Sequence, residues 1–121
     1  MTLLVWAAVV LIGGAGSVAR FLVDRTVSAW FGRSLPVGTL AVNISGATLL
    51  GFFAGAALTG DAALLAGTAF VGAYTTFSTW MIETQRLAEE RVYVVAARNI
   101  VVSLLFGVTA AYLGQWIGAH L

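Results

Sequence analysis

The chain has 121 residues, of which 60% are hydrophobic and 9% are charged. Soluble domains average about 45–50% apolar and about 25% charged residues, so this composition excludes both an ordinary soluble monomer and a disordered chain. There is no Cys, and His120 is the single His, so neither a thiolate nor a histidine cluster is available for a metal. The net charge of +1 gives no reason to expect a nucleic-acid partner.

Four segments contain no charged residue. They cover residues 1–19, 34–60, 62–82 and 99–121, with lengths of 19, 27, 21 and 23 residues. About 20 apolar residues in a helix cross the hydrocarbon of a bilayer. The sequence therefore predicts an all-α integral membrane protein of one domain, residues 1–121, with four transmembrane helices at about residues 2–22, 35–58, 62–86 and 93–118.

The arginines are distributed on one side only. All six lie in or beside the first and third connections, at positions 20, 25, 33, 86, 91 and 98. Arginine-rich connections stay in the cytoplasm during membrane insertion. We therefore expect a multi-pass protein of the cell membrane, with connections one and three cytoplasmic and both termini outside.

Small residues share one face of the first helix. Gly13, Gly16 and Arg20 are spaced so that they lie on the same side. Small residues of this kind commonly allow close packing between membrane helices. Arg20 either extends to the headgroups or has a packed role near an anion, and the spacing alone leaves both open.

The second helix places Thr39, Asn43 and Gly46 on one face. An Asn inside a hydrocarbon span must be hydrogen-bonded or line water. Asn43 is thus either an interhelical hydrogen-bonding residue or an amide donor to a permeating anion.

The third helix contains the most informative stretch, from Gly72 to Trp80. Gly, Tyr and successive Thr residues are poor helix formers in the middle of a span. One alternative is an unbroken helix with Ser and Thr hydroxyls bonded to the preceding turn. The other is a broken helix, whose freed carbonyls suit a cation and whose new N-terminus suits an anion.

The fourth helix repeats polar and small residues every four positions, at Asn99, Ser103, Gly107 and Ala111. This stripe is either a packing face or a hydroxyl-lined path. Glu83 is the only carboxylate that borders the third helix, and no second carboxylate, His or Cys can pair with it in the membrane. The pattern predicts no enzyme, and the lack of an ionisable residue well within a span favours a passive pathway.

Three motifs resemble those of the Fluc/CrcB fluoride channels. Residues 13–21 resemble GGxxGxxxR[YF] without matching every position, residues 36–46 match PxGTLxVNxxG, and residues 72–79 match GxxTTFST. The motifs occur in the family's order and lie on three of the four expected spans. The resemblance favours the broken third helix, and it implies passive export of cytoplasmic fluoride for fluoride resistance.

The family resemblance also implies an assembly and a set of sites. It implies an antiparallel, dual-topology dimer with two fluoride pathways and one central structural Na⁺ that is not transported. Backbone carbonyls of Gly72 and Thr75 would hold the Na⁺. The residues that correspond to the fluoride pathway are Arg20, Asn43, Thr76, Phe77, Ser78, Thr79, Trp80, Glu83 and Ser103, with Glu83 at a vestibule.

The chain departs from the family pattern in two ways. Trp80 stands where the family has the second of two paired phenylalanines. The one-sided arginines also disfavour insertion in both orientations, which an antiparallel homodimer requires. The partner subunit is therefore either a second copy or a related, oppositely oriented paralogue.

Two other functions fit a chain of this length. A small multidrug-type transporter would be expected to carry a membrane-embedded Glu in its first helix, and residues 1–19 contain none. A non-transporting assembly subunit would explain the glycine-rich faces but not Asn43 together with the Thr75–Thr79 stretch.

Overall fold

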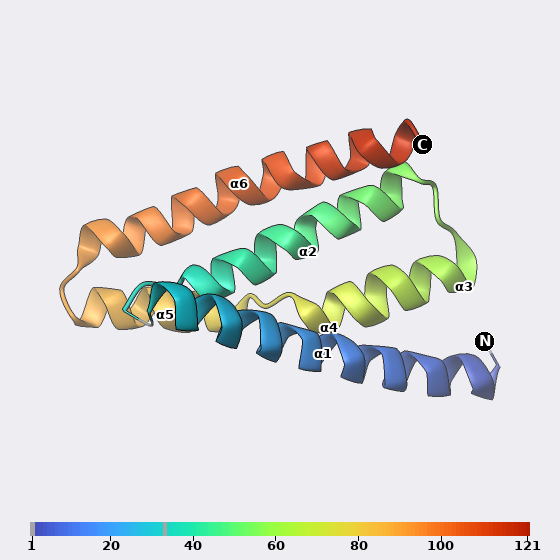
Figure 1. The fold of residues 1–121 in the computed structure, drawn as a ribbon, viewed down its shortest axis with the longest axis horizontal. Helices are drawn as coiled ribbons and strands as arrows, with labels where there is room; N and C mark the ends of the chain where they lie inside the picture. The colour runs from blue at the N-terminus through green and yellow to red at the C-terminus, as the bar shows by residue number, and fades with distance from the viewer. Residues whose placement is uncertain (1, 33) are drawn as a thin grey trace.

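The computed structural model describes residues 2–32 and 34–121, and every regular element in these ranges is helical (Figure 1). The all-α fold is thus confirmed. Three helices are long: α1 (Leu3–Phe31), α2 (Val37–Gly55) and α6 (Tyr93–Ala119). The third apolar region is divided into α3 (Gly60–Ala63), the π-helix η1 (Leu64–Val71), α4 (Gly72–Tyr74) and α5 (Ser78–Glu89).

The three long helices are apolar and long enough to cross a membrane. The shortest of them, α2, has 19 residues and therefore rises about 29 Å, close to the hydrocarbon thickness of a bilayer. Their outward faces carry large exposed side chains such as Leu11, Leu105 and Val108. A multi-pass membrane protein follows from these helices, while a fourth crossing by the divided region remains a prediction.

The connections lie at two opposite ends of the molecule. The two termini and the connection of residues 56–59 lie at one end, and the connections before α2 and before α6 lie at the other (Figure 1). Four crossings, as predicted, would produce this arrangement.

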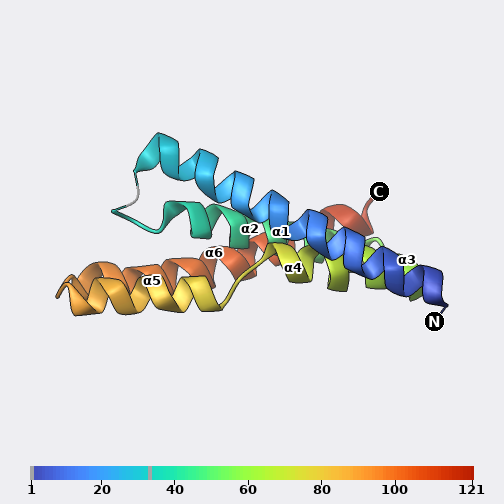
Figure 2. The same ribbon diagram turned by 90° about the horizontal axis from the view of Figure 1, so that it is seen from below.

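The first helix is longer than predicted. We expected it to end near residue 22, but α1 continues to Phe31 and ends at Gly32, whose φ is 83°. The fall in hydropathy near residue 22 marks the end of the hydrocarbon span. The helix itself continues, because no Gly or Pro occurs after residue 22 until Gly32. The C-terminal part of α1 lies away from α5 and α6 in Figure 2. Arg33, which we assigned to this connection, lies outside the described residues.

Helices α2 and α6 lie side by side along their length (Figure 1). Glycines alternate across their contact: Gly51 faces the Ala111 carbonyl, while Gly114 faces the Thr48 carbonyl. A Cβ at either glycine would collide with the opposite backbone. Such contact between backbones is the usual role of small residues in membrane helices.

Helix α1 packs against the first half of the divided region. Gly13 faces Ala69 and Ala73, and Gly16 faces Phe70. The predicted small-residue face of α1 is therefore a packing face against η1 and α4. It positions the interruption at residues 75–77 beside Arg20.

Candidate functional site

The divided third region is interrupted between Tyr74 and Ser78. The N–H of Thr75 still donates to the Val71 carbonyl at 3.0 Å, so helical bonding continues to that residue. The N–H of Thr76, which would bond to Gly72 in a continuous helix, donates to Asn43 instead. The Gly72 carbonyl thereby loses its helical donor, and the predicted break is present three residues after Gly72.

Asn43 holds the broken segment through both ends of its amide. Its Oδ1 accepts from the Thr76 N–H at 2.9 Å, and its Nδ2 donates to the Thr76 carbonyl at 2.8 Å. These two bonds satisfy backbone groups that would otherwise be unpaired inside a membrane. Asn43 is therefore an interhelical hydrogen-bonding residue, and one of its two Nδ2 hydrogens remains for another acceptor.

Thr76 also starts the second half of the region. Its Oγ1 accepts from the Thr79 N–H at 3.1 Å, which caps α5, and it lies 3.3 Å from the Ser78 hydroxyl. The first N–H groups of a helix point outward and carry the positive end of the helix dipole. The start of α5 therefore directs positive partial charge toward the break.

Arg20 contacts the same break from the α1 side. Its Nη1 donates to the Thr75 carbonyl at 3.4 Å. Of the two alternatives for this residue, the packed role is the one observed. Arg20 also lines a cavity of about 210 Å³ together with Asp24, Thr39 and Thr79.

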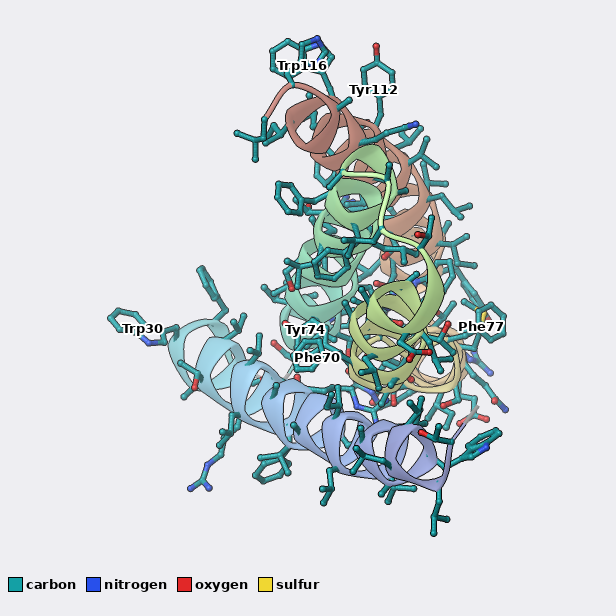
Figure 3. All side chains as sticks on the ribbon, turned by 90° about the vertical axis from the view of Figure 1, so that its right-hand side faces the viewer. Trp30, Phe70, Tyr74, Phe77, Tyr112 and Trp116 are labelled. Atoms are coloured by element: carbon teal, nitrogen blue, oxygen red, sulfur yellow. The ribbon has the colours of Figure 1, made fainter. Side chains whose placement is uncertain are left out.

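A groove of about 390 Å³ also borders the break, where α2 and α6 face the divided third region. Phe77 is 70% exposed and points outward in Figure 3. Its ring meets that of Trp80 edge to face, with 5.7 Å between centroids and 83° between planes. The predicted pathway residues that line this groove are Asn43, Thr76, Phe77, Trp80 and Ser103.

Trp80 is fixed to α6. Its indole N–H donates to the Asn99 carbonyl at 3.2 Å, and the Asn99 amide donates to the Thr84 hydroxyl at 2.8 Å. The indole N–H is therefore occupied and unavailable to a ligand, whereas the ring still faces the groove.

The residues of the polar stripe of α6 have different surroundings. Asn99 is buried and bonded to α5, while a Cβ on Gly107 would meet nothing within 4 Å. Ser103 and Gly107 both line the groove. Ala111, Gly114 and Gly118 pack against the backbone of α2, so the end of the stripe at Ala111 is a packing face, whereas Gly107 is not packed against another helix.

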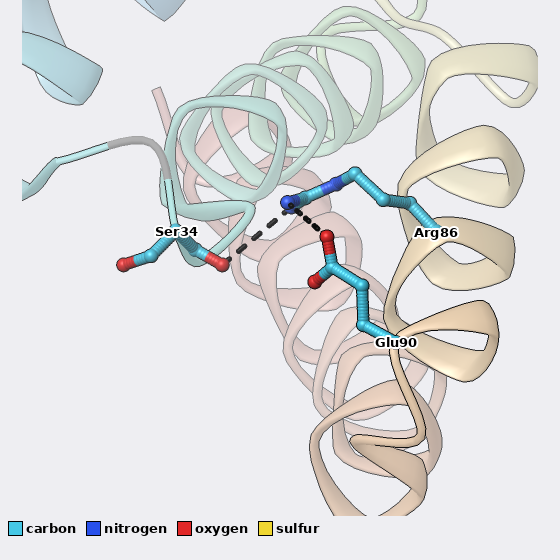
Figure 4. Close-up of polar contacts among 3 residues, drawn as sticks. All are labelled: Ser34, Arg86 and Glu90. Atoms are coloured by element: carbon cyan, nitrogen blue, oxygen red, sulfur yellow. Dashed lines mark hydrogen bonds and ion pairs between the residues drawn. The ribbon is translucent and has the colours of Figure 1, made fainter.

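Glu83 lies away from the groove, near the end of the molecule that holds α5. Its Oε1 is shielded from solvent and has no hydrogen-bond partner among the described residues, and Thr39 lies beside the carboxyl group. Farther along α5, Arg86 lies 3.7 Å from Glu90 and donates to the Ser34 carbonyl at 3.5 Å (Figure 4). These contacts connect α5 to the segment before α2.

The predicted site residues thus fall into three groups. One lines the groove, a second lines the cavity beside Arg20, and Thr76 belongs to both. Gly72 and Thr75 line a third hollow, and Thr75 also lines the groove. Ser78 and Glu83 line none of these hollows. Sequence reasoning did not assign sites to Thr39, Asn99 and Gly107, although their positions on polar faces signalled them.

Comparison with known proteins identifies the family of this chain. Residues 7–115 match the family profile described as "CrcB-like protein, Camphor Resistance (CrcB)". The protein named "Fluoride-specific ion channel FluC 2" of Mycobacterium tuberculosis is 66% identical over 97% of this chain and 93% of its own length. "Fluoride-specific ion channel FluC 1" of Nocardia farcinica is 44% identical over 91% of this chain and 81% of its own length. These relatives are named as ion channels, not enzymes, and the chain belongs to the CrcB family.

Proposed function

We propose that the chain forms a fluoride-selective channel that exports cytoplasmic fluoride passively and so protects the cell. The observation that carries this proposal is the pairing of Asn43 with Thr76 at a helix break beside a groove lined by neutral donors and aromatic rings. The names of the relatives support fluoride as the ion.

The chemistry of the groove suits a small, strongly hydrated anion. A pore must replace the water of such an ion with hydrogen-bond donors, and neutral donors do so without trapping it. The remaining Asn43 amide hydrogen, the Ser103 hydroxyl and the start of α5 supply these donors. The positive edge of the Phe77 ring adds a weak attraction. Thr79 and Arg20 would attract fluoride from the adjoining cavity, and Glu83 would lie at a vestibule.

We propose that a second subunit completes the pathway in antiparallel orientation, giving two pores per dimer. The groove is open along one side, and Phe77 is exposed there. A Cβ on Gly107 would enter open space, so another helix can approach closely at this position.

A structural Na⁺ between two such subunits fits the freed backbone groups. The Gly72 carbonyl has lost its helical donor, and the Thr75 carbonyl accepts the long Arg20 contact. Carbonyl oxygens suit hard cations, and two subunits would offer four of them. The ion would supply a fixed positive charge at the centre of the dimer, without being transported.

Arginines support an orientation. The described arginines lie at or toward the end that holds the connections before α2 and before α6, which we propose to be cytoplasmic. So uneven a distribution favours one orientation for this chain, and we propose an oppositely oriented paralogue as an alternative to a second copy.

The deciding experiment measures anion efflux from liposomes that contain the purified chain, alone and with any related subunit of the same cell. Fast fluoride efflux without chloride efflux would confirm the channel. Equal efflux of both ions would contradict selectivity, and no efflux from any combination would favour an assembly subunit. Activity of the chain alone would contradict the paralogue alternative.

A further inference from the structure

A small groove lies where the N-terminal ends of α2 and α6 meet. Its volume is about 120 Å³, and it is separate from the groove that Phe77 lines. Six of its eight lining residues are apolar: Leu35, Pro36, Val37, Leu40, Val95 and Val102. Neither the fold nor the proposed ion pathway uses this surface.

Arg98 supplies the charge of this groove. The second polar residue, Asn99, is 8% exposed, and its amide is directed to Thr84. Arg98 is exposed on α6, whereas the one ion pair among residues 2–32 and 34–121 joins Arg86 and Glu90. An unpaired guanidinium beside apolar side chains requires an anionic partner in a membrane.

The depth of Arg98 indicates what that partner is. Exposed Tyr93 and Trp116 suit the two interfaces of a bilayer, and 23 helical rises between them span about 35 Å. Arg98 lies five residues beyond Tyr93, and therefore about 7.5 Å deeper. At this depth, a guanidinium reaches the phosphate layer while its aliphatic part stays among acyl chains.

We propose that this groove binds one anionic phospholipid, with its phosphate on Arg98 and an acyl chain along Leu40 and Val102. Arg91, just before α6, adds positive charge at the same end and makes a net-negative headgroup favourable over a zwitterionic one. The bound lipid would join the ends of α2 and α6 at the membrane surface.

Native mass spectrometry of the purified full chain tests this directly. We would titrate phosphatidylglycerol and phosphatidylcholine with identical acyl chains and measure the fraction of chain that retains one lipid. We expect phosphatidylglycerol to bind at least about tenfold more tightly, which corresponds to about 1.4 kcal/mol. Equal retention of the two lipids would overturn the proposal.

Three variants locate the site. Arg98→Gln should abolish the preference, whereas Arg25→Gln removes an exposed arginine elsewhere and should keep it. Val102→Trp fills the groove and should weaken retention of both lipids. Equal losses in the two arginine variants would indicate a general charge effect and overturn the site. A change of subunit number in Val102→Trp with unchanged lipid retention would assign the groove to a second copy.

Thermal unfolding of the unmodified chain gives an independent measurement. Phosphatidylglycerol doped into detergent micelles should raise the Tm more than phosphatidylcholine does, because a ligand of the folded state stabilises it. No difference in Tm would contradict the proposal. Neither readout uses fluoride, so the lipid site can fail or stand independently of the channel.

Discussion

The α2–α6 contact and the break in the third apolar region use small and polar residues in opposite ways. In the first, Gly51, Gly114 and Gly118 bring backbone against backbone and leave no space for a ligand. In the second, Asn43 and Thr76 pair across a gap between two half-helices and leave a groove beside them. The same residue classes therefore produce a rigid frame in one place and a site in the other.

The difference depends on where the backbone hydrogen bonds go. The α2–α6 glycines lie within continuous helices, so their own backbone groups are satisfied. At residues 75–77 the helical pattern stops, and side chains of α1 and α2 take over its donors and acceptors. We expect changes in the frame to affect folding and changes at the break to affect conduction.

The largest effect should come from Gly114→Val. The new side chain would collide with the Thr48 carbonyl and the Phe52 N–H of α2, and overpacking of this kind costs about 3 kcal/mol or more. The yield of folded protein and its resistance to unfolding in denaturing detergent should both fall. Gly14→Val is the matched control, because a Cβ at Gly14 meets nothing within 4 Å. Equal losses in both variants would contradict the close α2–α6 packing as the cause of the destabilisation.

Asn43→Ala should affect conduction more than folding. It removes both bonds to Thr76 and the remaining amide hydrogen of Asn43, and we expect fluoride efflux to fall by about 100-fold or more. Asn43→Asp should be similarly impaired, because it would place a carboxylate oxygen against the Thr76 carbonyl. Size-exclusion chromatography should still show the assembled protein. Efflux at the original rate in either variant would contradict a role for this amide.

Phe77→Ala should have an intermediate effect, with efflux slowed about tenfold by loss of the ring edge. Folding should be unchanged, since this side chain is 70% exposed. Phe106→Ala offers a comparison, because Phe106 is 56% exposed on α6 and does not line the groove. If both variants slow fluoride to the same extent, the aromatic edge has no specific role.

The smallest effect should come from Ser45→Ala. The Ser45 hydroxyl donates to the Ala41 carbonyl at 2.7 Å, so the bond of 2.8 Å to Tyr74 has the Tyr hydroxyl as its donor. Its loss should reduce stability by about 1 kcal/mol and leave efflux unchanged. Tyr74→Phe removes the same bond from the other side. A double variant that is no less stable than either single one would show that the two hydroxyls act together.

Much of this arrangement could be predicted from the sequence, because charge placement reports directly on a membrane. Charge-free segments located the three long helices. Poor helix formers after Gly72 left the break as one of two alternatives, and the family resemblance favoured it. The spacing of Thr39, Asn43 and Gly46 also predicted a common face correctly. In the structure, Asn43 bonds to Thr76, and Gly46 packs against Tyr74 and Thr75.

Other features depended on contacts that one sequence does not encode locally. Hydropathy could not show that α1 continues to Phe31, since a helix can extend beyond the hydrocarbon layer that it crosses. The π-helix of Leu64–Val71 has no distinct composition. Gly107 and Gly114 look alike in a small-residue pattern. Only the position of α2 shows that Gly114 is packed against another helix and Gly107 is not.

The two-point pairing of Asn43 with Thr76 also limits how the pathway could open and close. Turning the amide over would bring its N–H against the Thr76 N–H and its oxygen against the Thr76 oxygen, so the group has a single stable orientation. The Asn43 side chain therefore keeps one orientation in the lining of the groove and does not act as a gate. Any gating motion would have to come from a mobile neighbour, such as the exposed ring of Phe77.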